Sequence, residues 1–180
     1  MKKIISVILL VFVLMLSSCS LDKDTSTKTP SNDKEVVSQE NEEKLYEYVL
    51  YYPDSQAQNL YPVVRKAIKD KVTDEKFILK ELLKGKGSDD GKYFTVIPTD
   101  TTINSCKEED GICTVDLSKE FLNIKGTATQ KMALYSVVNT LCNMDKVNSV
   151  QFLIDGKKVE IFGGYIFDEP FELDSSIIAE

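Results

Sequence analysis

The stretch that decides the fold is residues 127–143, TATQKMALYSVVNTLCN. Its apolar residues recur at the i, i+3, i+4, i+7 spacing of one helical face and are Leu134, Val137, Val138 and Leu141. Thr127 and Gln130 have the T-x-x-Q spacing of a capping box, in which two side chains satisfy backbone N–H groups at a helix start. The stretch therefore predicts a core-facing helix that begins at Thr127 and ends near Asn143.

The sequence before this helix predicts extended segments joined by turns. Tyr93–Ile97 and Thr101–Lys107 are extended stretches that Pro98 separates. Ile112–Leu117 follows Asp110-Gly111, and Asp-Gly is a strong hairpin signal because both residues tolerate a positive φ. We expect a hairpin around this pair.

The sequence after the helix repeats the pattern. Val147–Ile154 and Lys158–Phe162 are apolar or β-branched stretches on either side of Asp155-Gly156. This arrangement predicts a second hairpin, after which Gly163-Gly164 interrupts the chain.

The N-terminal part of the domain begins with a strand pattern. Glu47–Tyr52 is aromatic and β-branched with period two and ends at Pro53-Asp54, so Tyr48, Leu50 and Tyr52 share one face. Leu60–Ile68 is ambiguous between strand and helix, and its valines favour a strand.

A helix is expected next. Thr73 can cap it, and its apolar stripe ends at Lys84-Gly85. The order β-β-α-β-β-α-β-β predicts an α+β fold with two helices packed on one face of a mixed or mainly antiparallel sheet.

The N-terminus indicates export. Lys2 and Lys3 precede the apolar run Ile4–Leu16, which is too short for a transmembrane helix. Leu16-Ser17-Ser18-Cys19 resembles the lipobox of bacterial lipoproteins, and the resemblance implies a diacylglyceryl thioether on Cys19. An ordinary signal peptide with a chance cysteine is the alternative. If the lipobox is genuine, we expect residues 1–18 to be a signal peptide and the protein to be anchored by lipid to the outer face of the cytoplasmic membrane.

Residues 19–44 are expected to be a disordered tether that follows the lipidated cysteine. The segment has no aromatic side chain and few large aliphatic ones, so it cannot bury enough surface to offset the entropy of ordering. Residues 45–180 have the length and the apolar runs of one domain.

The composition excludes several classes of function. The chain has no His, which removes the commonest general base and metal ligand, and with it Ser-His-Asp and Cys-His mechanisms. Without the two lysines of residues 1–18, about 20 basic side chains face 29 acidic ones, a net charge near −9. We therefore expect no nucleic-acid partner and no membrane contact beyond the lipid anchor.

Several short segments occur in an order and spacing that resemble a known family. They are LYYPD at 50–54, LKELLKG at 79–85, IP at 97–98, DG at 110–111, VDLSKEF at 115–121, VNTL at 138–141 and VQFLIDG at 150–156. Over residues 46–172 the chain resembles the GerMN domain of sporulation and spore-germination lipoproteins. The resemblance implies a non-catalytic envelope domain that acts through protein or cell-wall contacts, with no cofactor.

Two features depart from the family pattern. Well-known members carry two such domains in tandem, whereas this chain has room for one. The family often has a P-E-x-R pattern in the second strand, whereas this chain has Pro62-Val63-Val64-Arg65. A salt bridge from Arg65 to that acidic residue is therefore not possible here.

Candidate catalytic and metal-binding groups have simpler explanations. Glu108, Glu109 and Asp110 share a predicted hairpin tip, and Asp89 and Asp90 lie in another loop, but their spacing lacks the ladder of a calcium loop. We expect solvated loop tips and no metal site. Asp116 and Ser118 lack a base that could activate the serine, so a strand end followed by a cap is the better interpretation. The sequence thus predicts no enzyme.

Tyr51 and Arg65 are the candidate interaction residues. If Tyr48, Leu50 and Tyr52 face the core, Tyr51 faces the uncovered side of the sheet, where an exposed aromatic ring can contact a protein or a glycan. A tyrosine that only covers a solvated face is the alternative. Exposed strand edges are natural sites for adding a partner strand.

The cysteines predict one disulfide. After Cys19 is used, Cys106, Cys113 and Cys142 remain in an oxidising compartment. Cys106 and Cys113 lie on the same face of the predicted hairpin, directly opposite or diagonal depending on loop length. We expect a Cys106–Cys113 disulfide and a buried free thiol at Cys142; two unpaired core cysteines are the alternative.

Two classes of function remain open from the sequence. The first is an assembly or interaction lipoprotein of the cell envelope that binds envelope proteins in sporulation or germination. The second is a lipoprotein that binds or processes peptidoglycan or another glycan, since two carboxyl groups about 5–9 Å apart could cleave a glycoside without histidine.

Overall fold

The structure is a computed structural model that describes residues 44–85, 87–166 and 168–180. Its strands are β1 (Leu45–Pro53), β2 (Leu60–Ile68), β3 (Ile103–Glu109), β4 (Ile112–Leu117), β5 (Ser149–Ile154), β6 (Ile161–Phe162), β7 (Tyr165–Ile166) and β8 (Phe171–Glu172). Its helices are α1 (Lys69–Val72), α2 (Glu75–Leu83) and α3 (Thr127–Cys142), with 3-10 turns η1 (Lys119–Asn123) and η2 (Ser175–Ile177). The predicted signal peptide, Cys19 and nearly all of the predicted tether lie outside the described residues.

Strands β1 and β2 form a long antiparallel hairpin that is a layer of its own. The register pairs Leu45 with Ile68 at one end and Pro53 with Leu60 at the other. The turn is closed by the Asp54 carboxylate, which accepts hydrogen bonds from the backbone N–H groups of Gln56, Gln58 and Asn59 at 2.9–3.1 Å. Both strands were predicted, including the ambiguous Leu60–Ile68.

The second layer is a four-stranded sheet in the order β3-β4-β5-β8. Strands β4 and β5 are parallel, because helix α3 connects them as a crossover, and the other pairs are antiparallel. The predicted Asp110-Gly111 hairpin joins β3 to β4, with φ of 53° and 85° at the two turn residues.

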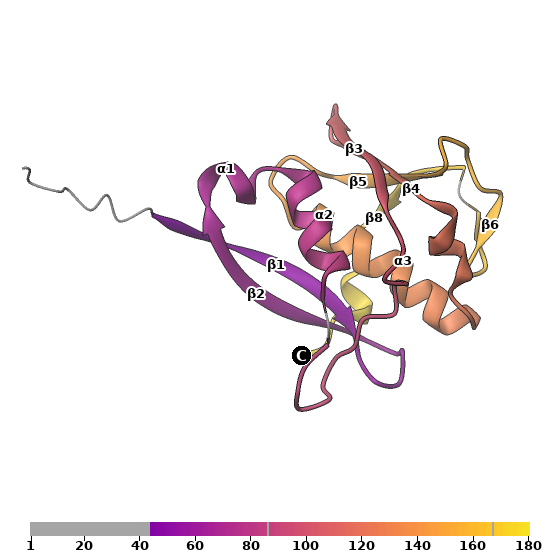
Figure 1. Cartoon of the computed structure of the whole chain (residues 1–180), viewed down its shortest axis with the longest axis horizontal. Coiled ribbons are helices and arrows are strands. Elements are labelled where there is room, and N and C mark those ends of the chain that lie inside the picture. The colour runs from indigo at the N-terminus through magenta and orange to yellow at the C-terminus, as the bar shows by residue number, and fades with distance from the viewer. Residues whose placement is uncertain (1–43, 86, 167) are drawn as a thin grey trace, which may run out of the picture. The chain divides into compact units, whose positions relative to one another are not determined.

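Helices α2 and α3 lie between the hairpin and this sheet, as Figure 1 shows. The stripe predicted on α3 is entirely buried, and Ile78, Leu79 and Leu82 of α2 join the same core. Leu50 and Tyr52 of β1 enter this core from the other side, as their period-two pattern predicted. The predicted α+β class, with two helices on one face of a mixed, mostly antiparallel sheet, is confirmed.

The caps of both helices differ from the sequence prediction. Asp74, and not Thr73, caps α2, because its carboxylate accepts a hydrogen bond from the Phe77 N–H at 3.0 Å. Gly126 is the N-cap of α3, with φ of 87°, and no side chain caps that helix. Gln130 instead donates from Nε2 to the Ile124 carbonyl at 2.9 Å, so the T-x-x-Q spacing does not form a capping box.

Two predicted extended regions are also different. After β5, the chain turns at Asp155-Gly156. Among the described residues, no strand pairs across this turn, and an isolated β-bridge joins Ile154 to Lys157. Strand β6 pairs with β7 around Gly163-Gly164, so the second hairpin forms one turn later than predicted. Within the predicted extended stretch 93–97, only Tyr93 forms a bridge, with Asp54.

The C-terminal segment is fixed to α3 by a buried amide. Asn139 is fully buried, donates from Nδ2 to the Asp174 carbonyl at 2.9 Å and accepts from the Asp174 N–H at 3.0 Å. This places η2 and Ile177 beside the β1-β2 hairpin, where Ile178 bridges Leu60. None of the helices in the described part of the chain is long and apolar enough to cross a membrane.

Candidate functional site

The outer edge of β1 is open at its N-terminal end. Residues of an antiparallel pair alternate between facing the partner strand and facing away from it. The Tyr51 N–H donates away from β2, to Oγ1 of Thr140 at 3.0 Å, and the Pro53 carbonyl accepts from the Phe94 N–H at 2.8 Å on the same edge. Val49 and Glu47 lie two and four residues before Tyr51 in the strand, so their N–H and C=O groups also point away from β2.

These backbone groups have no partner within residues 44–85, 87–166 and 168–180. An unpaired strand edge is a template for another strand, because each backbone donor and acceptor forms a hydrogen bond wherever it can. The open part of the edge runs from Leu45 to Val49, about 17 Å at the usual rise of a strand. It ends where Thr140 of α3 meets Tyr51.

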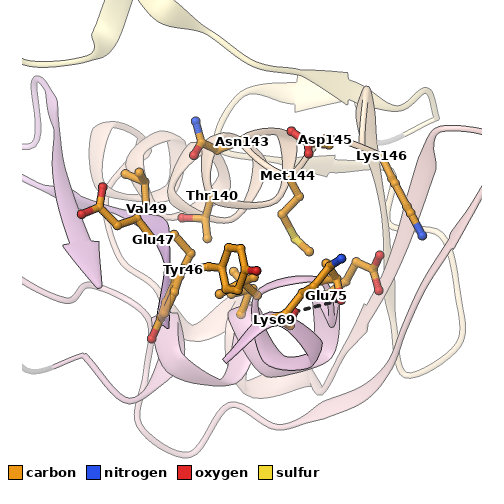
Figure 2. A pocket seen from close by; sticks show the side chains of 14 residues that line it. Tyr46, Glu47, Val49, Lys69, Glu75, Thr140, Asn143, Met144, Asp145 and Lys146 are labelled. Carbon is orange, nitrogen blue, oxygen red and sulfur yellow. Dashed lines mark hydrogen bonds between the residues drawn. The ribbon is translucent and has the colours of Figure 1, made fainter. Parts of the chain in front are cut away.

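A pocket of about 390 Å³ lies beside this open edge. Figure 2 shows Tyr46, Glu47 and Val49 of β1 on one side of it, with Thr140 of α3 beside them and Asn143 and Met144, which directly follow α3, farther along. Helix α1 and the first turn of α2 form the remaining wall with Lys69, Val72, Thr73 and Glu75. Three segments far apart in the sequence therefore meet around the edge.

The floor of the pocket is apolar and its rim is charged. Ile78 at the base is 1% exposed, and Val72, Met144 and the rings of Tyr46 and Tyr48 surround it. Burial raises the pKa of Tyr48, and the Glu81 carboxylate adds to this rise. A neutral aromatic floor of this kind accommodates an apolar side chain.

The rim has both signs of charge. Glu47 is paired across the hairpin with Lys66 at 3.2 Å. Lys69, Glu75, Asp145 and Lys146 form no ion pair with any described residue. Four unmatched charges, two of each sign, therefore border the pocket.

The threonine hydroxyl groups of the pocket form hydrogen bonds with the backbone. Thr140 accepts from the Tyr51 N–H, and Thr73 donates to the Lys69 carbonyl at 3.2 Å. No nucleophile–base hydrogen bond occurs among the described lining residues. No group of His, Cys, Asp or Glu side chains that could hold a metal ion occurs in the described part of the chain.

The structure corrects the role predicted for Tyr51. Its side chain is 7% exposed and packs with Leu60, Met132 and Ile177 in a second apolar cluster. At Tyr51 the odd-numbered face of β1 is thus covered by α3 and by the C-terminal segment, which the period-two pattern could not indicate. The prediction that Tyr51 lies on an uncovered face is wrong.

Arg65 is exposed, as an interaction residue must be. It lies opposite Tyr48 in the register, whereas Tyr51 lies opposite Pro62, so the two predicted residues point to opposite faces of the hairpin. Arg65 donates to the Val64 carbonyl at 3.2 Å and forms no ion pair among the described residues. Tyr51 and Arg65 therefore do not belong to one surface.

The acidic loop residues act within their own turns. Glu108 accepts from the Gly111 N–H at 2.7 Å, Glu109 pairs with Lys107, and Asp90 pairs with Lys92 at 3.0 Å. Asp116 accepts from the Gly156 N–H at 3.0 Å, and Ser118 Oγ accepts from the Thr102 N–H at 3.0 Å. The last two side chains therefore stabilise turns at the strand end.

The cysteines of the β3-β4 hairpin lie close together. In the two-residue-loop register, Cys106 faces Val115 and Cys113 faces Glu108, so the cysteines are diagonal neighbours on one face. Both are thiols, with sulfur atoms 3.5 Å apart. The contact with Cys106, and then burial, raises the pKa of Cys113. Cys142 is half-buried rather than buried, and burial raises its pKa to about 11. The disulfide stays a prediction.

Sequence reasoning missed the pocket. Helix α1, which supplies one wall, is a single turn with no apolar stripe and directly continues β2. Prolines do not tell the two edges apart, since Pro62 lies on the outer edge of β2 and Pro53 lies on the outer edge of β1 at the end of that strand.

Comparisons with solved structures agree with this fold. The chain is similar to the tandem GerMN domains of the sporulation protein GerM from Bacillus subtilis, with 23% identity and a TM-score of 0.60 over 75% of this chain and 48% of that one. It thus spans about half the length of the tandem protein. It is also similar to the first GerMN domain of the same protein, with 23% identity and a TM-score of 0.47 over 73% of this chain and 98% of that one.

A further similar structure is a candidate lipoprotein from Clostridium perfringens, with 24% identity and a TM-score of 0.49 over 71% of this chain and 87% of that one. None of the curated proteins matches the sequence. The model of the Germane family, described as sporulation and spore germination, matches residues 49–160. This match covers more than half of the chain and includes all of the helices and the strands β2 to β5. The chain therefore belongs to the Germane family of sporulation and spore germination, the GerMN-domain family that its sequence resembles.

Proposed function

We propose that this protein is a non-catalytic lipoprotein, anchored through Cys19 to the outer face of the cytoplasmic membrane, whose GerMN domain binds envelope proteins during sporulation or germination. The observation that carries the proposal is the open edge of β1, whose backbone groups at Glu47 and Val49 face a pocket. Such an edge binds a protein segment through main-chain hydrogen bonds. The lipobox and the family membership support the location and the process.

The proposal moves the working surface from Tyr51 to the pocket beside β1. Glu47 is exposed and lines this pocket, whereas Arg65 lies on the partner strand and Ile161 of β6 is 67% exposed outside it. These three positions allow a direct comparison of surfaces on one molecule.

The test is site-specific photo-cross-linking in the native cell. A photoreactive phenylalanine analogue replaces Glu47, Arg65 or Ile161, one at a time, and the cross-linked proteins are identified by mass spectrometry. We expect a discrete partner from position 47 and none from position 161. No partner from any position, or the same products from all three, would count against an interaction module.

A second candidate function is binding of peptidoglycan. The pocket combines the Tyr46 and Tyr48 rings with the Glu75 and Asp145 carboxylates, and aromatic and acidic side chains together can hold a sugar through stacking and hydrogen bonds. Cosedimentation of the purified chain with peptidoglycan, lost in Tyr46→Ala, would favour this candidate. Release of soluble fragments from that peptidoglycan would overturn the non-catalytic assignment.

A further inference from the structure

The two outer edges of the β1-β2 hairpin differ in how their backbone groups are covered. The outer edge of β2 is covered at Leu60, where Ile178 bridges it and the Ala179 N–H donates to the Leu60 carbonyl at 2.9 Å. Pro62 follows on that edge and offers no donor. The edge of β1 has no such block at Glu47 or Val49.

The open edge of β1 borders a pocket, and the walls of this pocket select the kind of strand that can join the edge. Thr73, Glu75, Asn143 and Met144 line the same pocket as Glu47 and Val49, so the edge is one wall of the pocket and these residues belong to the others. The matching edge of a second copy would bring its own α1 and α3 against these walls. A single extended chain about five residues long has no such bulk.

The charges of the rim indicate which side chains the partner has. Lys69 and Lys146 stand against Glu75 and Asp145 without ion pairs in the described part of the chain. A segment with only acidic or only basic side chains would meet two like charges. A segment with one of each sign complements the rim, because each of its charges has opposite charges within reach.

We propose that the pocket beside β1 binds an extended protein segment that pairs with the backbone of Glu47 and Val49, inserts an apolar side chain over Ile78, and has both an acidic and a basic residue. This inference rests on the proposed function, since it names the form of the protein partner at the same site. Recognition through the main chain supplies affinity, and the pocket and rim supply specificity.

The first experiment uses a fluorescent probe, the blocked peptide Lys-Val-Thr-Val-Glu, with the full chain in detergent micelles, followed by fluorescence anisotropy. In an added strand, N–H groups of alternate residues face β1. N-methylation of the central threonine and of the first valine therefore removes donors that point in opposite directions. We expect one methylated peptide to bind about tenfold more weakly and the other to bind within about twofold of the parent.

Two charge variants of the probe complete this experiment. Replacement of its glutamate by lysine, or of its lysine by glutamate, is expected to weaken binding several-fold. Equal losses from both methylations, no loss from either, or no saturable binding of any probe up to about 1 mM would overturn the inference.

The second experiment uses a matched pair of variants. Glu47→Pro removes the outward N–H of β1, and Lys66→Pro removes that of the opposite residue on β2. Both substitutions break the same exposed ion pair, so they differ in the edge that they alter and in the loss of the Glu47 side chain from the pocket wall. We expect about tenfold weaker probe binding for E47P and less than twofold for K66P, with similar thermal stabilities. Equal losses of probe binding in E47P and K66P would overturn the inference. If E47P does not fold, the methylated peptides provide the test.

Two further results separate this inference from the proposed function. Retention of the in-cell cross-linked partner by folded E47P, with no probe binding, would overturn strand addition and leave an interaction module in place. A dimer in sedimentation velocity that E47P dissolves would place a second copy at this edge and overturn the inference. Absence of any cross-linked partner would contradict the proposed function itself.

Discussion

At the scale of single residues, Tyr51 connects three parts of the molecule. Its ring packs with Leu60, Met132 and Ile177, and its backbone N–H donates to Thr140. The hairpin, helix α3 and the C-terminal segment therefore share one small apolar cluster. Burial of the ring raises the pKa of Tyr51, so the hydroxyl group stays neutral throughout the physiological range.

We expect Tyr51→Ala to lower the free energy of unfolding by about 2–4 kcal/mol, because truncation of a buried aromatic side chain removes apolar contacts and leaves a cavity. Val64→Ala, at a 52% exposed position on the neighbouring strand, is the control and should change it by less than about 0.5 kcal/mol. Urea unfolding followed by circular dichroism measures both. Equal stability of Y51A and the wild type would mean that the ring is not part of a core.

Asp54 is the second residue that stabilises the hairpin, because its carboxylate closes the turn between β1 and β2. Although burial acts to raise the pKa of Asp54, hydrogen bonds from Gln58, Asn59 and Gln56 lower it below its usual 3.8. A lowered folded-state pKa means that the interaction stabilises the protein above the unfolded pKa. This contribution is lost as the pH falls through the folded pKa.

We expect Asp54→Ala to lower the free energy of unfolding by about 1–2 kcal/mol at pH 7, the usual effect of losing a carboxylate that satisfies several backbone donors. The difference from the wild type should shrink as the pH falls below about 4. Urea unfolding at pH 7 and at pH 3 checks this, with Ser55→Ala in the same turn as control. A difference that is independent of pH would show that the charge of Asp54 does not stabilise the turn.

At the scale of elements, the sequence predicted strands and helices well where a pattern of one segment decides them. Period two marks β1, and the buried stripe marks α3, because each segment contacts a single large core on one face. The caps were mispredicted, since Asp74 and Gly126 lie one residue from the predicted caps and only backbone geometry separates the choices. The second cluster around Tyr51 depends on Met132 and Ile177, which are distant in sequence.

The β3-β4 hairpin leads to a prediction at this scale. Cys106 and Cys113 have sulfur atoms 3.5 Å apart on one face, so an approach of about 1.5 Å would give disulfide bond length. We expect this disulfide in protein purified from the native envelope, where oxidation is possible. A loop this short would contribute about 2–3 kcal/mol if unstrained.

The measurement is alkylation of the unfolded protein without reductant, followed by mass spectrometry. Unfolding is necessary because the raised pKa values of Cys113 and Cys142 keep both thiols protonated in the folded protein. One labelled thiol is expected in the domain, at Cys142, and three after reduction. Three labelled thiols without reduction would refute the disulfide, and Cys142→Ala identifies which cysteine remains free.

At the scale of the whole molecule, the proposed binding site is a property of the fold and not of any one segment. The pocket needs the edge of β1, the single turn of α1 and the end of α3, which the chain brings together only after α3 crosses from β4 to β5. No residue of the pocket belongs to a motif with its own chemical signature. The sequence could therefore predict an exposed strand edge but not which edge is open.

The final prediction concerns the lipid anchor proposed at Cys19. Cys19 lies outside the described residues, and the lipobox Leu16–Cys19 after a short apolar run predicts its lipidation. Because two acyl chains hold a protein on a membrane without any transmembrane helix, Cys19→Ala should leave an uncleaved precursor or release protein into the medium. Ser20→Ala, beside the position predicted to be lipidated, is the control and should behave like the wild type. Cell fractionation and mass spectrometry of the N-terminal peptide measure the outcome. An unmodified N-terminal peptide in a wild-type protein that still fractionates with membranes would show that another part of the chain holds it there.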